Sequence, residues 1–258
     1  MEKIDLSGMT LLLTNDDGIT GEGLILLEKT LKDAGASVFV LAPDSNRSGV
    51  SSLLTMENPL VFRRVKENWF SCSGSPVDCT ISAILSLIFG GRKFDAVISG
   101  INKGANLGTD VVYSGTCAAA RQAVLYGVPG IALSVESYDG TWKFGAMAEF
   151  CAKNLKKLIS LCTNDVFVSV NGRSADIYNG VGFASLSIRD YRDRVSLISD
   201  PNGSDDVFYG FFAGGNIQSS KRKEEKCEDD FSMSSRGLVC VTRIFAEPSA
   251  KNDFGSEF

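Results

Sequence analysis

Short apolar runs alternate with amphipathic segments over the first 170 residues, and few folds are compatible with this alternation. The runs have the length of buried strands, whereas leucines recur at helical spacing in the segment after the first run. A strand, a helix and a second strand at this spacing form a βαβ unit, which requires a parallel sheet. We therefore predict an α/β protein with a mostly parallel sheet. The expected buried strands are 9–14, 38–41, 94–99, 130–135 and 166–170.

The expected helices and one additional strand pair complete this part of the chain. Two short extended pieces, 60–63 and 68–72, are predicted to pair in antiparallel fashion beside the main sheet. In Ser75-Pro76, the serine suits the N-cap of a helix and the proline suits its first position. The expected helices are 21–35, 76–90, 114–126 and 143–161.

Beyond Asn171 the alternation stops. Strand-length segments at 181–188 and 237–244 flank a polar region, and we predict an arm of hairpins and loops that packs on a partner subunit. The whole chain, 1–258, is expected to form a single domain. Its core would cover about residues 1–180, and the oligomerisation arm and C-terminal segment would cover about residues 181–250.

Two adjacent carboxylates follow the first predicted strand, in Asn15-Asp16-Asp17-Gly18. In open α/β sheets, ligands bind at the carboxyl ends of the strands. Adjacent residues of a regular strand point to opposite faces, so Asp16 and Asp17 can converge on one ion only if the chain bends, which Gly18 permits. A divalent cation would offset the repulsion between the two charges. An ordinary acidic turn is the alternative.

Composition excludes several classes of function. The chain has no histidine, which rules out Ser-His-Asp and Cys-His catalysis, phosphohistidine intermediates and His-ligated zinc. The net charge of −5 argues against binding of a nucleic-acid polymer, which needs a basic surface. No apolar stretch is long enough for a membrane span, and no secretion signal is recognisable, so we expect a cytoplasmic protein without membrane association. Its seven scattered cysteines are expected to be reduced.

Polar loops after later strands are expected at the same edge of the sheet as Asp16. Ser48 lies in a loop after the second strand, and Asn102 and Asn106 lie in the glycine-rich segment 100–108. Ser114 opens the next helix, whose N-terminus suits an anion, although Ser114 as a plain helix cap is the alternative. Carboxylate, hydroxyl and amide oxygens beside a helix N-terminus are typical of a phosphate-ester site with a hard divalent cation.

At these positions the chain resembles the SurE (survival protein E) family of nucleoside 5′-monophosphate phosphatases, most strongly over residues 9–135. The segments that carry the resemblance are Asn15-Asp16-Asp17-Gly18, Asn46-Arg47-Ser48-Gly49, Ser73-Gly74-Ser75-Pro76-Val77-Asp78-Cys79, Ser99-Gly100-Ile101-Asn102-Lys103-Gly104-Ala105-Asn106-Leu107-Gly108 and Tyr113-Ser114-Gly115-Thr116-Cys117-Ala118-Ala119-Ala120. The resemblance implies a Rossmann-like three-layer core and a C-terminal arm that exchanges between subunits of a homodimer or homotetramer.

The resemblance also implies a site and a reaction. The ligands of one divalent metal ion per subunit, Mg²⁺ or Mn²⁺, would be Asp16, Asp17, Ser48 and Asn102. The contacts to the substrate phosphate would be Asn106, Ser114, Gly115 and Thr116. The substrates would be nucleoside 5′-monophosphates, with some activity on 3′-monophosphates and short polyphosphate.

The reaction that follows is hydrolysis of a phosphomonoester by a metal-activated water. Asp16 or Asp17 would be the catalytic carboxylate that orients the water, and the sequence does not distinguish between them. One alternative is a phosphatase of the haloacid dehalogenase type, but that class needs Asp-x-Asp, whereas here the two acids are adjacent. Two non-enzymatic alternatives are a catalytically silent module that binds nucleotide and metal, and a purely structural oligomeric protein, which has no use for this oxygen cluster.

Overall fold

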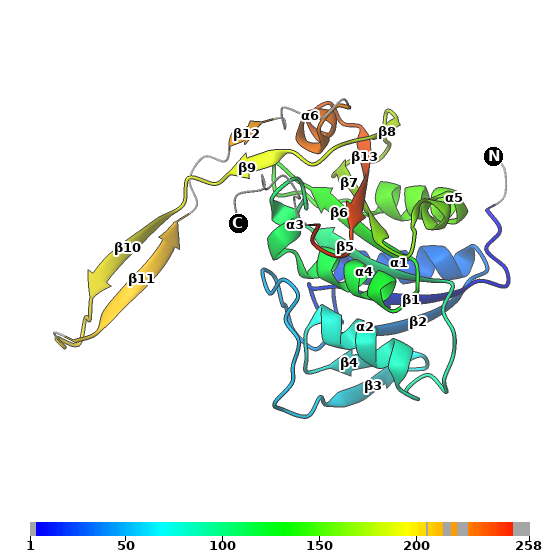
Figure 1. Cartoon of the computed structure of the whole chain (residues 1–258), viewed down its shortest axis with the longest axis horizontal. Coiled ribbons are helices and arrows are strands. Elements are labelled where there is room, and N and C mark those ends of the chain that lie inside the picture. Colours follow the sequence, from blue (N-terminus) through cyan, green and yellow to red (C-terminus); the bar gives the residue numbers. More distant parts are fainter. Residues whose placement is uncertain (1–3, 205, 214–217, 221–226, 250–258) are drawn as a thin grey trace, which may run out of the picture.

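The fold is built on a nine-stranded, mostly parallel sheet in the order β3-β4-β2-β1-β5-β6-β7-β13-β8, shown in Figure 1. The computed structural model describes residues 4–204, 206–213, 218–220 and 227–249. The strands from β4 to β7 in this order are parallel, β3 is antiparallel to β4, and β13 is antiparallel to β7 but parallel to β8. The strands of the sheet are β1 (Thr10–Thr14), β2 (Ser37–Pro43), β3 (Phe62–Lys66), β4 (Trp69–Cys72), β5 (Ala96–Lys103), β6 (Gly130–Glu136), β7 (Val166–Arg173), β8 (Val181–Phe183) and β13 (Val239–Phe245).

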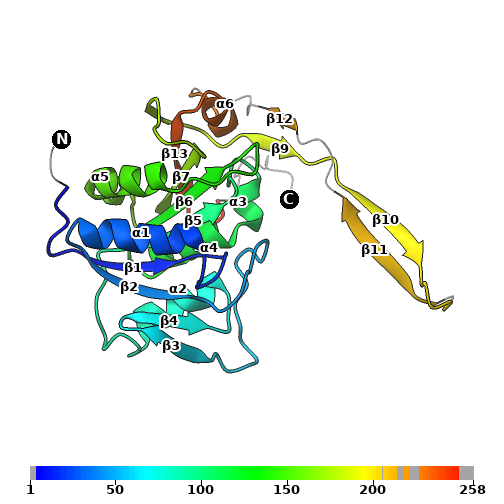
Figure 2. The same ribbon diagram turned by 180° about the vertical axis from the view of Figure 1, so that it is seen from behind.

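Helices cover both faces of this sheet, which gives three layers. The helices α1 (Glu22–Asp33) and α5 (Gly145–Leu161) lie on the face seen in Figure 2, and α2 (Pro76–Leu85) and α4 (Gly115–Leu125) lie on the other. The prediction of an α/β fold with a mostly parallel sheet is confirmed. The predicted helices and core strands are all present, with differences at some of their ends.

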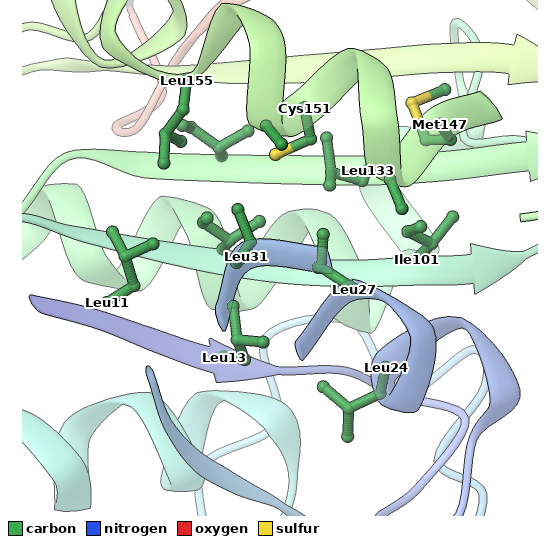
Figure 3. Close-up of a cluster of buried hydrophobic side chains, with 14 of the residues drawn as sticks. Leu11, Leu13, Leu24, Leu27, Leu31, Ile101, Leu133, Met147, Cys151 and Leu155 are labelled. Carbon is green, nitrogen blue, oxygen red and sulfur yellow. The ribbon is translucent and has the colours of Figure 1, made fainter. Parts of the chain in front are cut away.

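The core beneath α1 and α5 shows why these segments are helical. Leu24, Leu27 and Leu31 of α1 are fully buried and pack toward the sheet, where Leu133 of β6 lies between the two helices (Figure 3). Leu155 supplies the matching apolar contact from α5. Burial of a leucine side chain stabilises the fold by roughly 1.5–3 kcal/mol, so the apolar faces of these two helices hold them on the sheet.

Two predicted boundaries were wrong. The helix expected over 76–90 ends at Leu85, because Ser86 adopts an extended conformation and its hydroxyl accepts the Ile88 N–H at 3.2 Å. Such a local side-chain bond competes with continuation of the helix. The loop expected over 100–108 begins later, because β5 continues to Lys103 after a register shift and pairs with β6 there.

The C-terminal third contributes two strands to the main sheet and also forms a hairpin outside it. The strand β13 pairs with β7, and β8 lies at the sheet edge, so residues from the expected C-terminal segment belong to the main sheet. The expected strand 181–188 is divided between β8 and β9 (Ile188–Asp190), and β9 pairs with β12 (Gln218–Ser220). A hairpin of β10 (Arg194–Ser199) and β11 (Phe208–Ala213) extends away from the body of the molecule in both views.

Two short helices complete the described chain, α3 (Asp110–Tyr113) and α6 (Asp230–Ser235). All seven cysteines are free thiols, as predicted. Among the residues that the structure describes, no helix has the length and apolar character needed to span a bilayer.

Candidate active site

The predicted polar groups meet at the carboxyl ends of β1 and β5. The chain passes from β1 to β2 on one side, while β5 lies on the other side of β1, so the strand order reverses between β1 and β5. Open α/β sheets bind ligands at such a switch point. A cleft of about 320 Å³ opens there, and its lining includes Asp16, Ser48, Asn102, Asn106 and Ser114.

The bend after β1 is fixed by Asn15. Its side-chain amide donates to the Gly18 carbonyl at 2.8 Å, and its oxygen accepts the Gly18 N–H at 3.2 Å. Gly18 has a φ of +100°, and a Cβ there would lie 3.0 Å from the Ser45 backbone, so glycine is required. The turn therefore has the bend that the sequence predicted, and it places Asp16 in the cleft.

Asp16 is 3% exposed and is bound by the start of α4. Its Oδ1 accepts the Thr116 hydroxyl at 2.6 Å, and its Oδ2 accepts the Thr116 N–H at 3.1 Å. Burial raises the pKa of Asp16, the neighbouring Asp17 charge adds to the rise, and the bonds from Thr116 oppose it. The close approach of the helix depends on Gly115, where a Cβ would lie 3.0 Å from the Asp16 Cβ.

Asp17 is half-buried and accepts the Lys103 N–H at 3.1 Å through Oδ2. Burial raises its pKa, and the Lys103 backbone bond and charge oppose the rise. Asp17 is not among the residues that line the cleft, whereas Asp16 is. The two carboxylates are therefore anchored to two different elements, α4 and β5, on either side of the β1 turn.

The other two predicted ligands, Ser48 and Asn102, both line the cleft. Asn102 donates its side-chain N–H to the Gly104 carbonyl at 2.9 Å, which leaves its amide oxygen as the atom suited to a cation. Ser48 is exposed, and its backbone N–H is held by the Asn46 side chain at 2.7 Å. These positions bring Asp16, Ser48 and Asn102 to one cleft, with Asp17 beside it.

The four predicted phosphate contacts differ in their surroundings. Ser114 caps α4, since its hydroxyl oxygen accepts the Cys117 N–H at 3.0 Å, and its hydroxyl hydrogen can still be donated to a ligand. Asn106 donates its side-chain N–H to Ser134 at 2.8 Å. Gly115 and Thr116 are buried behind the cleft wall, and the Thr116 hydroxyl is engaged with Asp16. In this geometry both the hydroxyl and the backbone N–H of Thr116 position the Asp16 carboxylate.

Several residues that the sequence analysis did not identify hold the loop 104–108 in place. Asn171 on β7 accepts the Asn106 N–H at 2.8 Å and donates to the Asn106 carbonyl at 3.1 Å. Asp230 on α6 is 1% exposed and accepts the Gly108 N–H at 2.7 Å and the Ser187 N–H at 2.9 Å. These partners are 65 and 122 residues away from the loop residues that they bind, so no local sequence pattern indicates them.

The donor set suits a hard cation. The described residues contain no group of three or more histidine, cysteine, aspartate or glutamate side chains placed to hold a metal ion. The proposed ligand set is mixed, with the buried carboxylate of Asp16, the half-buried carboxylate of Asp17, one amide oxygen and one hydroxyl. Mg²⁺ is typically bound by one or two carboxylates together with water and substrate phosphate. Oxygen ligands of this kind are the ones that a hard divalent cation prefers, so the residues present fit such an ion.

Comparison with known proteins identifies the family. A family model described as survival protein SurE matches residues 11–193. The chain belongs to the SurE family. The matched range contains every predicted site residue, whereas α6 and β13 of this SurE protein lie beyond it.

Relatives with curated names agree with this family. The 5′-nucleotidase SurE of Treponema pallidum is 44% identical over 187 residues, which cover 70% of this chain and 100% of the relative. The 5′-nucleotidase SurE of Vibrio cholerae is 34% identical over 251 residues, which cover 96% of each chain. Among solved structures, the SurE protein from Aquifex aeolicus is similar with a TM-score of 0.76 and 31% identity, over 93% of this chain and 94% of that chain.

Proposed function

We propose that this chain is a metal-dependent 5′-nucleotidase that hydrolyses nucleoside 5′-monophosphates to nucleosides and phosphate. The observation that carries the proposal is the buried Asp16 carboxylate placed against the N-terminus of α4 at the switch point of the sheet. The carboxylate suits a cation and the helix N-terminus suits an anion, and the two are adjacent. A phosphate ester that binds through a cation requires this arrangement. The curated relatives named 5′-nucleotidase support the choice of substrate.

The proposed ligands of one Mg²⁺ or Mn²⁺ ion are Asp16, Asp17, Ser48 and Asn102. When bound, the cation would polarise a phosphoryl oxygen and lower the pKa of a water molecule. Thr116 and the Lys103 backbone keep Asp16 and Asp17 oriented before substrate arrives. This arrangement reduces the reorganisation that binding requires.

The phosphoryl group would lie between Ser114, Asn106 and the first turn of α4. The helix N-terminus and the Ser114 hydroxyl stabilise the negative charge that develops as water attacks phosphorus and the P–O5′ bond breaks. The proton released by the water is taken up by a carboxylate, Asp16 or Asp17. The departing nucleoside alkoxide takes a proton from solvent water and becomes the alcohol, and the carboxylate returns its own proton to solvent.

The test measures phosphate release from a panel of nucleoside monophosphates in EDTA and then with added Mg²⁺ or Mn²⁺. We expect release only with a cation. We expect Asp16→Asn to abolish release while the circular dichroism spectrum stays unchanged, and the exposed Asp33→Asn variant to retain release. Cation-independent release, or normal turnover by Asp16→Asn, would refute the proposed site. Nucleotide binding without release under any cation would favour the catalytically silent module.

We further propose that a second copy of this chain covers the β10–β11 hairpin, as a homodimer or homotetramer. The hairpin exposes apolar side chains on two strands that pair only with each other among the described residues. An isolated two-stranded hairpin has marginal stability in water, and an exposed apolar patch of this kind marks an interface. Its exposed apolar residues are Val195, Leu197, Ile198, Phe208, Phe211 and Phe212. The free thiols of the protein suit the reducing cytoplasm, where we place it.

A further inference from the structure

Two tyrosine side chains stand in the wall of the cleft that contains Asp16 and Asn102. Tyr113 ends α3, and Tyr191 lies between β9 and β10, so they reach the same cleft from distant parts of the chain. Their ring centroids are 6.2 Å apart and their planes are inclined by 76°. This is an edge-to-face arrangement, which leaves aromatic faces available to a third ring.

Tyr191 is held at its hydroxyl end. The hydroxyl donates to Oδ1 of Asp110, the first residue of α3, whose Oδ2 accepts the Leu107 N–H at 3.1 Å. The guanidinium of Arg189 lies 3.5 Å from the same carboxylate. Burial, together with the Asp110 charge, raises the pKa of the Tyr191 hydroxyl, which therefore stays protonated. The ring is thus fixed to the loop that contains Asn106.

Tyr113 is held by hydrogen bonds to its backbone, and its ring contacts that of Tyr191. Its carbonyl accepts the Ser51 N–H at 3.0 Å, and the Ser51 hydroxyl donates to the preceding carbonyl, that of Val112, at 2.7 Å. These bonds tie Tyr113 to the loop that carries Ser48. The next residue, Ser114, caps α4 at the proposed phosphate position. The side chain itself remains 56% exposed.

The chemistry of the cleft separates into two regions. Its described lining is otherwise made of acidic, amide, hydroxyl, small and lysine residues, and the two tyrosines supply its only aromatic surface. The polar region suits the cation and the phosphate. The aromatic region therefore suits the part of a substrate that is flat, uncharged and joined to the phosphate.

We infer that Tyr113 and Tyr191 form a stacking platform for the nucleobase and so select nucleotides over other phosphomonoesters. The inference rests on the proposed function and adds the residues that determine its substrate class. Every nucleobase has a π-face, so stacking distinguishes substrates with a base from substrates without one and does not favour one base strongly. Tyrosine offers this surface at low entropic cost, because its ring has only two rotatable bonds.

The experiment compares AMP with ribose 5-phosphate, which carries the same scissile phosphate and sugar but no base. Stacking of one base on an aromatic side chain contributes enough for a tenfold or larger effect. We therefore expect Tyr113→Ala and Tyr191→Ala each to lower the preference for AMP over ribose 5-phosphate in kcat/KM by about tenfold, mainly through KM. Tyr113→Phe keeps the ring and should retain the preference, and Tyr126→Ala, an exposed tyrosine at the far end of α4, serves as the matched control.

Other outcomes would overturn the platform. Equal losses for both substrates would show that the tyrosines only support the fold, and an unchanged preference would show that the base binds elsewhere. Adenosine should also inhibit ribose 5-phosphate turnover competitively in the wild type and much less in the alanine variants.

Failure of the proposed function gives a different result, namely no phosphate release from either substrate by the wild type. In that case calorimetric titration with AMP still tests the platform, because the alanine variants should bind AMP about tenfold more weakly. Equal affinity would refute it. If Tyr191→Ala does not fold, the Tyr113 variants decide the question, since both rings are required.

Discussion

The pairing of Thr116 with Asp16 gives a sharp prediction for Thr116→Val. Valine has nearly the same shape as threonine, and Thr116 is 0% exposed, so the substitution removes the hydroxyl without opening a cavity. What is lost is the 2.6 Å bond to Oδ1 of Asp16, while the backbone bond to Oδ2 remains. The variant therefore leaves a buried carboxylate oxygen without its donor.

The magnitude follows from the charge of Asp16. A hydrogen bond to an ionised group contributes about 1.5–3 kcal/mol, against about 0.5–1.5 kcal/mol for a neutral pair. We expect the free energy of unfolding in EDTA to fall by about 1.5–3 kcal/mol at neutral pH. The bond from Thr116 opposes the rise in the pKa of Asp16, so its loss raises that pKa further. The deficit should then grow as pH rises through the raised folded-state pKa of Asp16, because the ionised carboxylate is the form that loses most from the missing hydroxyl.

The measurement is urea unfolding of wild type, Thr116→Val and Thr116→Ser in EDTA between pH 5 and pH 8. Thr116→Ser keeps the hydroxyl and should lie much closer to wild type. Because Asp16 is a proposed ligand, Thr116→Val should also raise the Mg²⁺ concentration for half-maximal phosphate release. A valine variant as stable as wild type, or a deficit that does not grow with pH, would refute the view that Thr116 holds an ionised Asp16.

Two further predictions concern parts of the chain outside the site. Asp230 accepts the Gly108 and Ser187 N–H groups, and Asp230→Asn leaves one of them without an acceptor. The free energy of unfolding should therefore be about 1–3 kcal/mol lower than in wild type. Burial raises the pKa of Asp230, so wild-type stability falls as pH rises through it, and the difference measured by urea unfolding should shrink with rising pH. For the hairpin, the double variant Leu197→Ser/Phe212→Ser should have the mass of one chain in light scattering. The control Leu87→Ser, at another exposed leucine, should leave the mass unchanged. An unchanged mass in the hairpin variant would place the interface elsewhere.

The sequence predicted those parts of the fold that depend on local periodicity. Leucines at helical spacing identify α1, and the apolar run before Asn15 identifies β1, because each pattern reflects burial of one segment against the sheet. Segment ends were harder, since the end of α2 depends on the conformation of Ser86 and the end of β5 on pairing with β6. The return of β13 to the sheet was not predicted, because an apolar strand does not indicate which partner it will choose.

The site was predictable to the same extent. Asp16 follows β1, and Asn102 lies at the carboxyl end of β5, so both positions belong to one edge of the parallel sheet. The family resemblance implied that Thr116 contacts the phosphate, and the structure shows its hydroxyl bound to Asp16. Asn171 and Asp230 act on the site from other elements, so they could be found only once the sheet and α6 were placed.

Three carboxylates share one structural role around this cleft. Asp16 accepts the Thr116 N–H, Asp17 the Lys103 N–H and Asp230 the Gly108 N–H, so each binds the backbone of a neighbouring segment. These hydrogen bonds link the carboxylates to the surrounding backbone and help to shape the cleft. Burial nevertheless raises the pKa of all three, so the shape is obtained at an electrostatic cost. In the proposed mechanism a divalent cation offsets the penalty of burying a charged carboxylate at Asp16 and Asp17. Asp230 lies on α6, outside the proposed ligand set, so no cation offsets the penalty there.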